Sequence, residues 1–336
     1  MTDILLETAV FGAKALIVVV SALCVMFAAA VLARRGGRDE PADRGRVVVT
    51  DLGRRYRAMA DAVRRTLLDD KEWKALTKRR KKEAAEADGR PTVFVLDFDG
   101  DIAANGVGAL RRLVTTVLQI AMGEDEVVVR LRSPGGLVPG YGLAASQLSR
   151  LREAEIPVTV CVDVVAASGG YMMAVVSDRL LAAPFAIIGS IGVFVPVPNI
   201  HRLLREHGVD YDEITSGRYK RTVGLLGEIT DEGRQKTQEQ ADETHQLFKD
   251  HVALHRPDLD IDSVATGEFW YGTQALALGL VDEVSTSDDH LVRRVEDARL
   301  LHLRYERADN LARRVLGWWS RASALRGALP RLPRAS

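Results

Sequence analysis

The sequence predicts an α/β domain in which helices cover a mostly parallel sheet, preceded by one N-terminal transmembrane helix. Two observations predict the domain. Short β-branched apolar runs alternate with helical stripes from Thr92 onwards, and the runs are apolar on both faces, which is typical of strands buried between layers of helices. A third observation, an apolar run over residues 15–33, predicts the transmembrane helix.

The elements of the domain follow one another in a regular order. The first strand, TVFVLDF, lies between Pro91 and an Asp/Gly turn, and the next segment, 107–121, has apolar residues at helical spacing. The further strands are expected at 126–132, 156–165, 178–184 and 186–194, and at the end of 272–284. The further helices are expected at 141–154, directly after Ser168, at 198–207 and 230–255, and at the start of 272–284.

The apolar run over residues 15–33 contains 19 uncharged residues. As a helix it would be about 28 Å long, close to the thickness of the hydrocarbon layer. The alternative is a cleaved signal peptide, for which the small residues Ala28–Ala30 would mark the end, but the run is too long and the start MTDILLE is acidic. Five arginines follow the run within 34–46, so the positive-inside rule puts the C-terminal portion in the cytoplasm.

Charge divides the chain into four parts: an anchor region (1–33), a basic stalk (34–91), the domain (92–290) and a basic tail (291–336). Residues 34–90 carry 18 Lys/Arg against 11 Asp/Glu, whereas 91–309 carry 21 against 33. The basic flanks are therefore expected to meet an anionic surface. The cations at 78–82 either lie on anionic lipid headgroups or belong to a solvated linker, and the tail, with Trp318 and Trp319, either contacts the membrane interface or packs on the domain.

The sequence indicates neither a metal nor a cofactor. Cys24 and Cys161 are too few for a disulfide framework, and neither C-x-x-C nor H-E-x-x-H occurs. His251 and His255 are four residues apart, but nothing nearby completes a metal site, so they are interpreted as the polar face of a helix. We expect no nucleic-acid partner.

Two glycine-rich loops follow predicted strands and can carry chemistry. In RSPGG (132–136) the glycines either form a tight turn or point backbone N–H groups at a developing oxyanion. In AASGG (166–170) Ser168 has small neighbours that would let a substrate approach, and the helix that begins at Gly169 offers its amide to the same oxyanion. Position 166 is alanine, so this loop is not a G-x-S-x-G elbow.

A serine nucleophile needs a base, and no histidine occurs before His201. The candidate is Lys220, which lies among small and apolar residues in TSGRYKRTVGLL (215–226). A lone lysine is usually a solvated surface group. To act as a base it must be neutral, and burial in an apolar pocket, together with Arg218 and Arg221, would favour the neutral form.

Six segments in the same order resemble the signal peptide peptidase A family of inner-membrane peptidases: LRSPGGLVPGYGLAASQL, VDVVAASGGYMMAVVSD, APFAIIGSIGVF, SGRYKRTVGLLGE, ETHQLFKDHV and VATGEFWYGTQALALGLVDEV. The resemblance runs from about Val93 to Asp288. It implies a ClpP/crotonase-like fold and a Ser–Lys dyad. Ser168 would be the nucleophile, Lys220 the general base and Ser190 the serine that orients the lysine, while the amides of Gly136 and Gly169 would form the oxyanion hole.

The resemblance also implies the biology. The chain would be a single-pass protein of the bacterial inner membrane that cleaves extended apolar peptides, such as signal peptide remnants, through an acyl-enzyme. Better-known members of the family place the catalytic domain outside the cytoplasmic membrane, opposite to the side that the arginines within 34–46 favour, so both sides remain alternatives. Shorter members of the family assemble into rings in which the serine and lysine of one site can come from adjacent subunits. Two alternatives remain: a crotonase-type acyl-CoA enzyme, and a non-catalytic membrane scaffold of the same fold.

Overall fold

The computed structural model describes residues 45–86 and 89–306. Residues 47–305 form one compact unit. The expected anchor at 15–33 and the basic tail from residue 307 onwards lie outside the described residues. Within the described ranges, no helix combines the length and the apolar character needed to cross a bilayer.

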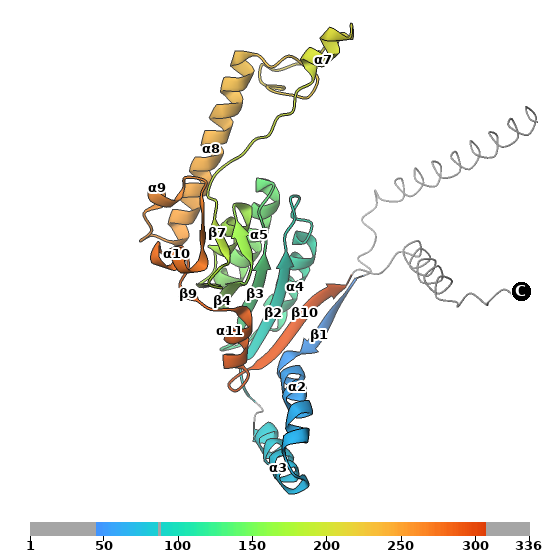
Figure 1. Ribbon diagram of the computed structural model, residues 1–336, viewed down its shortest axis with the longest axis vertical. Coiled ribbons are helices and arrows are strands. Elements are labelled where there is room, and N and C mark those ends of the chain that lie inside the picture. Colours follow the sequence, from blue (N-terminus) through green and yellow to red (C-terminus); the bar gives the residue numbers. More distant parts are fainter. Residues whose placement is uncertain (1–44, 87–88, 307–336) are drawn as a thin grey trace, which may run out of the picture. The chain divides into compact units, whose positions relative to one another are not determined.

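The centre of the unit is a seven-stranded sheet with the order β1-β10-β2-β3-β4-β6-β9. Every neighbouring pair from β10 to β9 is parallel, whereas β1 runs opposite to β10 (Figure 1). The predicted mostly parallel sheet is thus confirmed. Its strands are β1 (Arg46–Asp51), β2 (Thr92–Asp99), β3 (Glu126–Arg132), β4 (Val158–Val162), β6 (Arg179–Ala182), β9 (Glu283–Val284) and β10 (Arg299–Glu306).

The strands are apolar on both faces because helices cover both. In β2, Phe94, Leu96 and Phe98 face one core while Val93 and Val95 face the other, as the two-residue period of a strand requires. The helices of the larger core are α4 (Val107–Ile120), α5 (Val138–Glu153), α6 (Gly169–Ala174) and the C-terminal half of α8 (Asp231–His255). The smaller core lies under the first turn of α2 (Leu52–Leu67) and under α11 (Ser287–Arg294).

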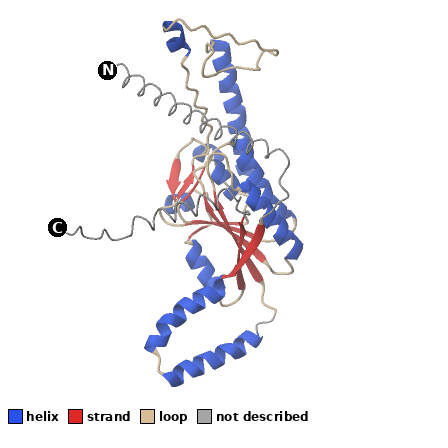
Figure 2. Cartoon of the chain, turned by 90° about the vertical axis from the view of Figure 1, so that its right-hand side faces the viewer, coloured by secondary structure: helices blue, strands red, loops and turns tan. Residues whose placement is uncertain are grey.

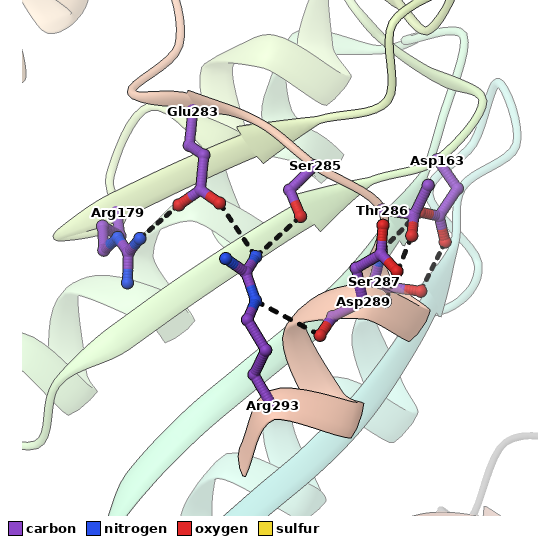
Figure 3. Close-up of polar contacts among 8 residues, drawn as sticks. All are labelled: Asp163, Arg179, Glu283, Ser285, Thr286, Ser287, Asp289 and Arg293. Atoms are coloured by element: carbon purple, nitrogen blue, oxygen red, sulfur yellow. Dashed lines mark hydrogen bonds and ion pairs between the residues drawn. The ribbon is translucent and has the colours of Figure 1, made fainter.

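Helix α11 is held against the sheet by polar contacts at its start (Figure 3). Asp163, directly after β4, accepts hydrogen bonds from the N–H of Ser287 at 2.7 Å and from its hydroxyl at 2.5 Å. Arg293 donates to Glu283 of β9 and to Ser285, both at 2.8 Å. The first turn and the last turn of α11 are therefore both joined to strand ends.

A second, three-stranded sheet with the order β5-β7-β8 lies beside the first. The segment 156–165, predicted as one strand, ends β4 at Val162 and begins β5 at Val165, so the chain passes from one sheet to the other at Asp163. This passage brings the end of β5 and the residue that follows it, Ser168, to the edge of the larger core. The strands are β5 (Val165–Ala167), β7 (Ile187–Gly189) and β8 (Phe269–Tyr271).

The main sheet contains two strands, β1 and β10, that lie outside the segment 92–290 from which it was predicted. Strand β10 lies between β1 and β2, so residues on both sides of the predicted domain belong to it. The stalk is likewise not a plain linker, because after β1 it continues as α2 and then α3 (Asp70–Glu86). The basic residues of 34–90 and the acidic pairs of 288–297 interrupt the apolar patterns. For this reason the sequence did not indicate the bounds of β1, α2, α3 and β10.

Between β7 and α8, residues 192–230 extend away from the sheets (Figure 1). We call this segment the arm. It contains one short helix, α7 (His201–Glu206). The arm returns to α8, whose first residues are capped by the side chain of Thr230, which accepts a hydrogen bond from the N–H of Gly233 at 3.1 Å. Two further short helices, α9 (Ile261–Val264) and α10 (Gly272–Ala277), complete the unit.

Candidate active site

Ser168 lies in the turn between β5 and α6 with unusual backbone angles. Its φ is +51° and its ψ is −120°, a region that costs a residue other than glycine about 1–3 kcal/mol and that is concentrated at functional sites. The turn is fixed by two hydrogen bonds, from the N–H of Ser168 to the carbonyl of Gly189 at 2.8 Å and from the N–H of Met172 to the carbonyl of Ser168 at 2.9 Å. The side chain is half-buried.

The loop after β3 packs directly against this turn. Ser133 donates its N–H to Val165 at 2.8 Å and accepts one from Ala167 at 3.0 Å, which ties the two strand ends together. A Cβ placed on Gly135, whose φ is +91°, would lie 2.7 Å from the Cβ of Ser168 and 2.9 Å from the nitrogen of Gly169. The loop after β3 and the turn at Ser168 are therefore in contact, as expected from the sequence.

Two backbone amides at this junction are open to a ligand. No hydrogen bond among the described residues uses the N–H of Gly136 or of Gly169, and Gly169 begins a helix, where the first N–H groups have no partner within the helix. The N–H of Gly135 instead donates to the hydroxyl of Ser133 at 3.1 Å. The N–H groups of the predicted pair, Gly136 and Gly169, are therefore both without a partner among the described residues.

Gly136 has no room for a side chain. A Cβ on it would lie 2.2 Å from the carbonyl oxygen of Ile102, and its φ of +158° is at the limit of what other residues adopt. The carbonyl of Ile102 also accepts the N–H of Leu137 at 2.8 Å. The position of the Gly136 amide is therefore set by close contact between two backbones.

Tyr141 and Ser133 hold the loop after β3 in place through hydrogen bonds of their hydroxyl groups. The sequence analysis assigned no role to either residue. The hydroxyl of Tyr141 donates to the carbonyl of Asp101 at 2.9 Å and lies 2.5 Å from the hydroxyl of Ser133. Both residues are fully buried, and burial raises the pKa of Tyr141. The only signal in the sequence was one large polar side chain within the small-residue run VPGYGLAAS.

The glycines after Ser168 are required by packing. A Cβ on Gly169 would lie 2.5 Å from the ring of Tyr141, and one on Gly170 would lie 2.7 Å from the carbonyl of Ser133. The approach of a substrate, for which the sequence predicts small residues here, stays a prediction. The contacts add a packing reason, because the two glycines let α6 lie close to the loop after β3.

Ser190 lies beside this group. It follows Gly189, which accepts the N–H of Ser168, and its own N–H donates to the carbonyl of Glu268 at 2.7 Å. Its φ is also +51°. The structure thus brings Ser168, Gly136, Gly169 and Ser190 together at the ends of β3, β5 and β7.

Lys220 is not part of this group within one chain. It lies in the arm with its side chain exposed, two residues before Thr222, whose hydroxyl accepts a hydrogen bond from Thr237 of α8 at 3.0 Å. The other end of α8 contacts α6, where a ring nitrogen of His251 lies 2.9 Å from the carbonyl of Met172. Thr237 and His251 are 14 residues apart on one helix, hence about 21 Å at 1.5 Å per residue, too far for the Lys220 side chain to bridge.

Two acidic residues of β2 have cationic partners. Asp97 faces the smaller core, where burial opposes its ionised form but hydrogen bonds from His302 and Arg130 outweigh this and lower its pKa to about 2. Asp99 pairs with Arg132 at 3.0 Å. Asp101, in the loop after β2, instead accepts hydrogen bonds from Asn105, which lower its pKa.

Apolar side chains surround the candidate site. Ile102, Leu137 and Val138, next to the open amides, are all exposed. A cleft of about 540 Å³ lies between α5 and α8 and reaches Met172, one helical turn from Ser168.

No group of three potential metal ligands occurs in residues 45–86 and 89–306. His251 and His255 contact each other edge to face, and burial, followed by the charges of His251 and Arg152, lowers the pKa of His255 to about 4. Cys161 is buried, and burial raises the pKa of its thiol to about 12. Cys24 lies outside the described residues.

Comparisons with known proteins identify relatives of this chain. Residues 150–301 match Peptidase family S49, and residues 3–148 match Peptidase family S49 N-terminal. The chain is similar to the Probable protease SohB of Haemophilus influenzae, with 47% identity over 80% of this chain and 81% of that protein. It is also similar to the Probable protease SohB of Buchnera aphidicola subsp. Acyrthosiphon pisum, with 49% identity over 63% of each chain.

More distant likenesses have related descriptions. Protease 4 of Salmonella typhi is 31% identical over 53% of this chain and 29% of that protein. Among solved structures, a membrane-bound stomatin-specific protease is 17% identical, covers 61% of this chain and 85% of its own, and has a TM-score of 0.40.

Proposed function

Because this chain belongs to peptidase family S49, the signal peptide peptidase A family, and is a serine-type peptidase, we propose that it is a membrane-anchored endopeptidase with a Ser168–Lys220 dyad. The observation that carries the proposal is the strained turn at Ser168, which lies beside the two open amides of Gly136 and Gly169. We further propose that its fold is ClpP/crotonase-like.

In the proposed reaction the hydroxyl of Ser168 attacks a peptide carbonyl while neutral Lys220 takes the hydroxyl proton. The negative charge that develops on the carbonyl oxygen is stabilised by the N–H groups of Gly136 and Gly169. Lys220 then gives its proton to the leaving amine, and water hydrolyses the acyl-enzyme. Neither a metal nor a cofactor is needed in this scheme.

The position of Lys220 implies that a second subunit takes part. Since α8 separates the arm of one chain from its own Ser168, we propose a homo-oligomer in which the arm of one subunit brings Lys220 to the Ser168 of its neighbour. Ser190, whose N–H donates to the carbonyl of Glu268 directly before β8, is proposed to orient the incoming amine. Burial at that interface would favour the neutral lysine.

The proposed substrates are extended apolar peptides, including signal peptide remnants and other membrane-derived segments. The exposed side chains of Ile102, Leu137 and Val138 beside the open amides support this choice. The run 15–33 is proposed to anchor the protein in the bacterial inner membrane as a single pass. The arginines that follow it favour a cytoplasmic position for the domain.

Labelling with a fluorophosphonate probe tests the nucleophile. Wild-type protein is expected to react covalently, and Ser168→Ala is expected to lose the label, because the probe needs an activated serine next to an oxyanion hole. Ser146→Ala is the matched control, since Ser146 is an exposed serine on α5. Equal labelling of Ser168→Ala and wild type would exclude Ser168 as the nucleophile.

A further inference from the structure

The helical hairpin formed by α2 and α3 (residues 52–86), which we call the basic hairpin, projects from the main sheet (Figures 1 and 2). It carries 12 Lys/Arg against six Asp/Glu. We propose that the basic hairpin is a docking surface for a bilayer rich in anionic phospholipids, with an apolar stripe of α2 lying among the headgroups. This contact would act in addition to the proposed anchor at 15–33.

The apolar stripe continues a face of α2 that begins in the core. Leu52, Tyr56, Met59, Val63 and Leu67 follow one another at intervals of three or four residues and so share one side of the helix. Leu52 is buried and Tyr56 packs on the smaller core. The helix then passes beyond the sheet, and the last three side chains are 62%, 59% and 74% exposed.

Helix α3 does not cover this stripe. The contacts between the two helices are polar: Arg80 pairs with Asp61 at 2.6 Å, Arg65 pairs with Asp70 at 3.1 Å, and the Arg65 guanidinium lies 5.5 Å from the ring of Trp73. The helices meet at their turn and diverge away from it (Figure 2). Met59, Val63 and Leu67 therefore remain on an outer side of the basic hairpin.

The positive charge of the basic hairpin is not neutralised internally. Asp61 is shared by Arg64 and Arg80, whose hydrogen bonds and charges lower its pKa. A groove of about 1120 Å³ along α2 is lined by seven arginines, and Arg54 and Arg57 there have no acidic partner among the described residues. Asp51, Asp61 and Glu296 also line the groove, so arginines outnumber acidic residues there and the groove favours an anionic partner.

A bilayer suits this combination better than a second copy of the basic hairpin. Exposed apolar residues on one side of a helix and arginines on the others are typical of helices that lie in the membrane interface, where anionic headgroups attract the cations. Two copies of the basic hairpin would place their excess cations against each other. The exposed Met59, Val63 and Leu67 would remain apolar surface in water if no lipid met them.

A fluorescent label on the stripe tests the proposal in the full-length protein. Cys24→Ser leaves only the buried Cys161, and Leu67→Cys then carries the dye. The protein is reconstituted in phosphatidylcholine, with or without phosphatidylglycerol, each containing a lipid with a nitroxide at the headgroup. Quenching is expected to be several-fold stronger with phosphatidylglycerol and to disappear in about 1 M salt, where the Debye length is about 3 Å.

Leu247→Cys is the matched control. Leu247 is also a leucine on a helix surface, 69% exposed against 74% for Leu67, but α8 carries six acidic and three basic residues. Its dye is expected to show the same weak quenching in both lipids. A second variant, Arg55→Gln with Arg64→Gln, removes the arginines that flank the stripe on its two sides. It is expected to reduce the quenching at Leu67→Cys several-fold while the dye remains exposed in detergent.

Equal quenching at Leu67→Cys in the two lipids would overturn the proposal, and so would a dye already shielded in detergent, which would indicate that another protein surface covers the stripe. Failure of the anchor gives a different result, because the protein would not enter the bilayers. The labelled protein would then be added to preformed vesicles of the same lipids, where the proposal requires the same lipid-dependent quenching.

Discussion

The two halves of the proposed dyad lie in opposite surroundings. Ser168 is held in a strained turn by backbone contacts that leave no space for one additional carbon at Gly136 or Gly169. Lys220 lies in the arm, exposed, and the one hydrogen bond that it forms with the described residues runs from its backbone N–H to the carbonyl of Gly217 at 3.1 Å. The surroundings of Ser168 are therefore complete within one chain. The side chain of Lys220 would gain comparable surroundings only from a second subunit.

This difference separates two kinds of substitution. A change near Ser168 disturbs packing and chemistry together, because the same contacts place the amides and close the core. A change at Lys220 removes chemistry alone, since no contact of its side chain supports the fold of the single chain. Measurements of stability and of activity on the same variants can therefore distinguish the two regions.

The largest expected effect is that of Lys220→Ala. We expect kcat to fall by at least about 10³-fold, as for other members of a catalytic dyad or triad, with the free energy of unfolding changed by less than about 0.5 kcal/mol, as is usual at exposed positions. Peptide cleavage and thermal unfolding in detergent measure the two quantities. Arg202→Ala, 93% exposed in the same arm, is the control and should retain activity.

Gly136→Ala is expected to reduce kcat by about 10²–10³-fold, the range for loss of one oxyanion donor. The added Cβ would meet the carbonyl of Ile102 and displace the amide. Gly142→Ala on α5 is the matched control, because a Cβ there meets nothing within 4 Å. That control should retain activity and be more stable by about 0.5–1 kcal/mol, as for glycine in a helix interior. Full activity of Gly136→Ala would exclude its amide from the oxyanion hole.

Tyr141→Phe should affect stability first and activity second. The variant removes the hydroxyl that joins Ser133 to the carbonyl of Asp101, and buried groups left without a partner cost about 1–3 kcal/mol. We expect the free energy of unfolding to fall by that amount in denaturant titration, with a smaller loss of kcat than in Gly136→Ala. An unchanged midpoint would show that the network does not support the loop.

The smallest expected effect is a pH dependence of stability at His255. Its pKa in the fold is lowered to about 4 from 6.5 by burial and by the charges of His251 and Arg152. Because the unfolded chain binds the proton first, stability should be full above about pH 6.5 and fall as the pH drops toward 4. His255→Gln should lose less stability between pH 7.5 and 5 than wild type, measured by thermal unfolding. Parallel curves would contradict this assignment.

Much of the fold was predictable because its strands are apolar on both faces and its helices have clear stripes. The predicted strands at 92–98 and 126–132 match β2 and β3 closely. The meeting of the two glycine loops was also predicted, but the reason lies outside one sheet: β5 belongs to the second sheet, and its Ala166 forms a parallel bridge with Ser133 at the end of β3. Strand β1 could not be predicted, because its run RVVVTD lies within a highly charged segment.

The roles of Tyr141 and Lys220 were beyond sequence reasoning for different reasons. Tyr141 contacts Ser133, eight residues away, and the carbonyl of Asp101, 40 residues away, and these contacts form only when the loops pack. Lys220 was identified from its neighbours and from the resemblance, but its distance from Ser168 depends on the direction of α8. A periodic pattern predicts that a helix forms, and it does not predict where its far end lies.

The central claim is that one active site takes Ser168 from one chain and Lys220 from another. Co-expression of the full-length Ser168→Ala and Lys220→Ala variants with different tags tests it most directly. In a cyclic oligomer assembled from equal amounts, about a quarter of the sites would have an intact serine facing an intact lysine, so about a quarter of wild-type cleavage should return. No recovery in mixed oligomers that both tags can isolate would contradict the shared site.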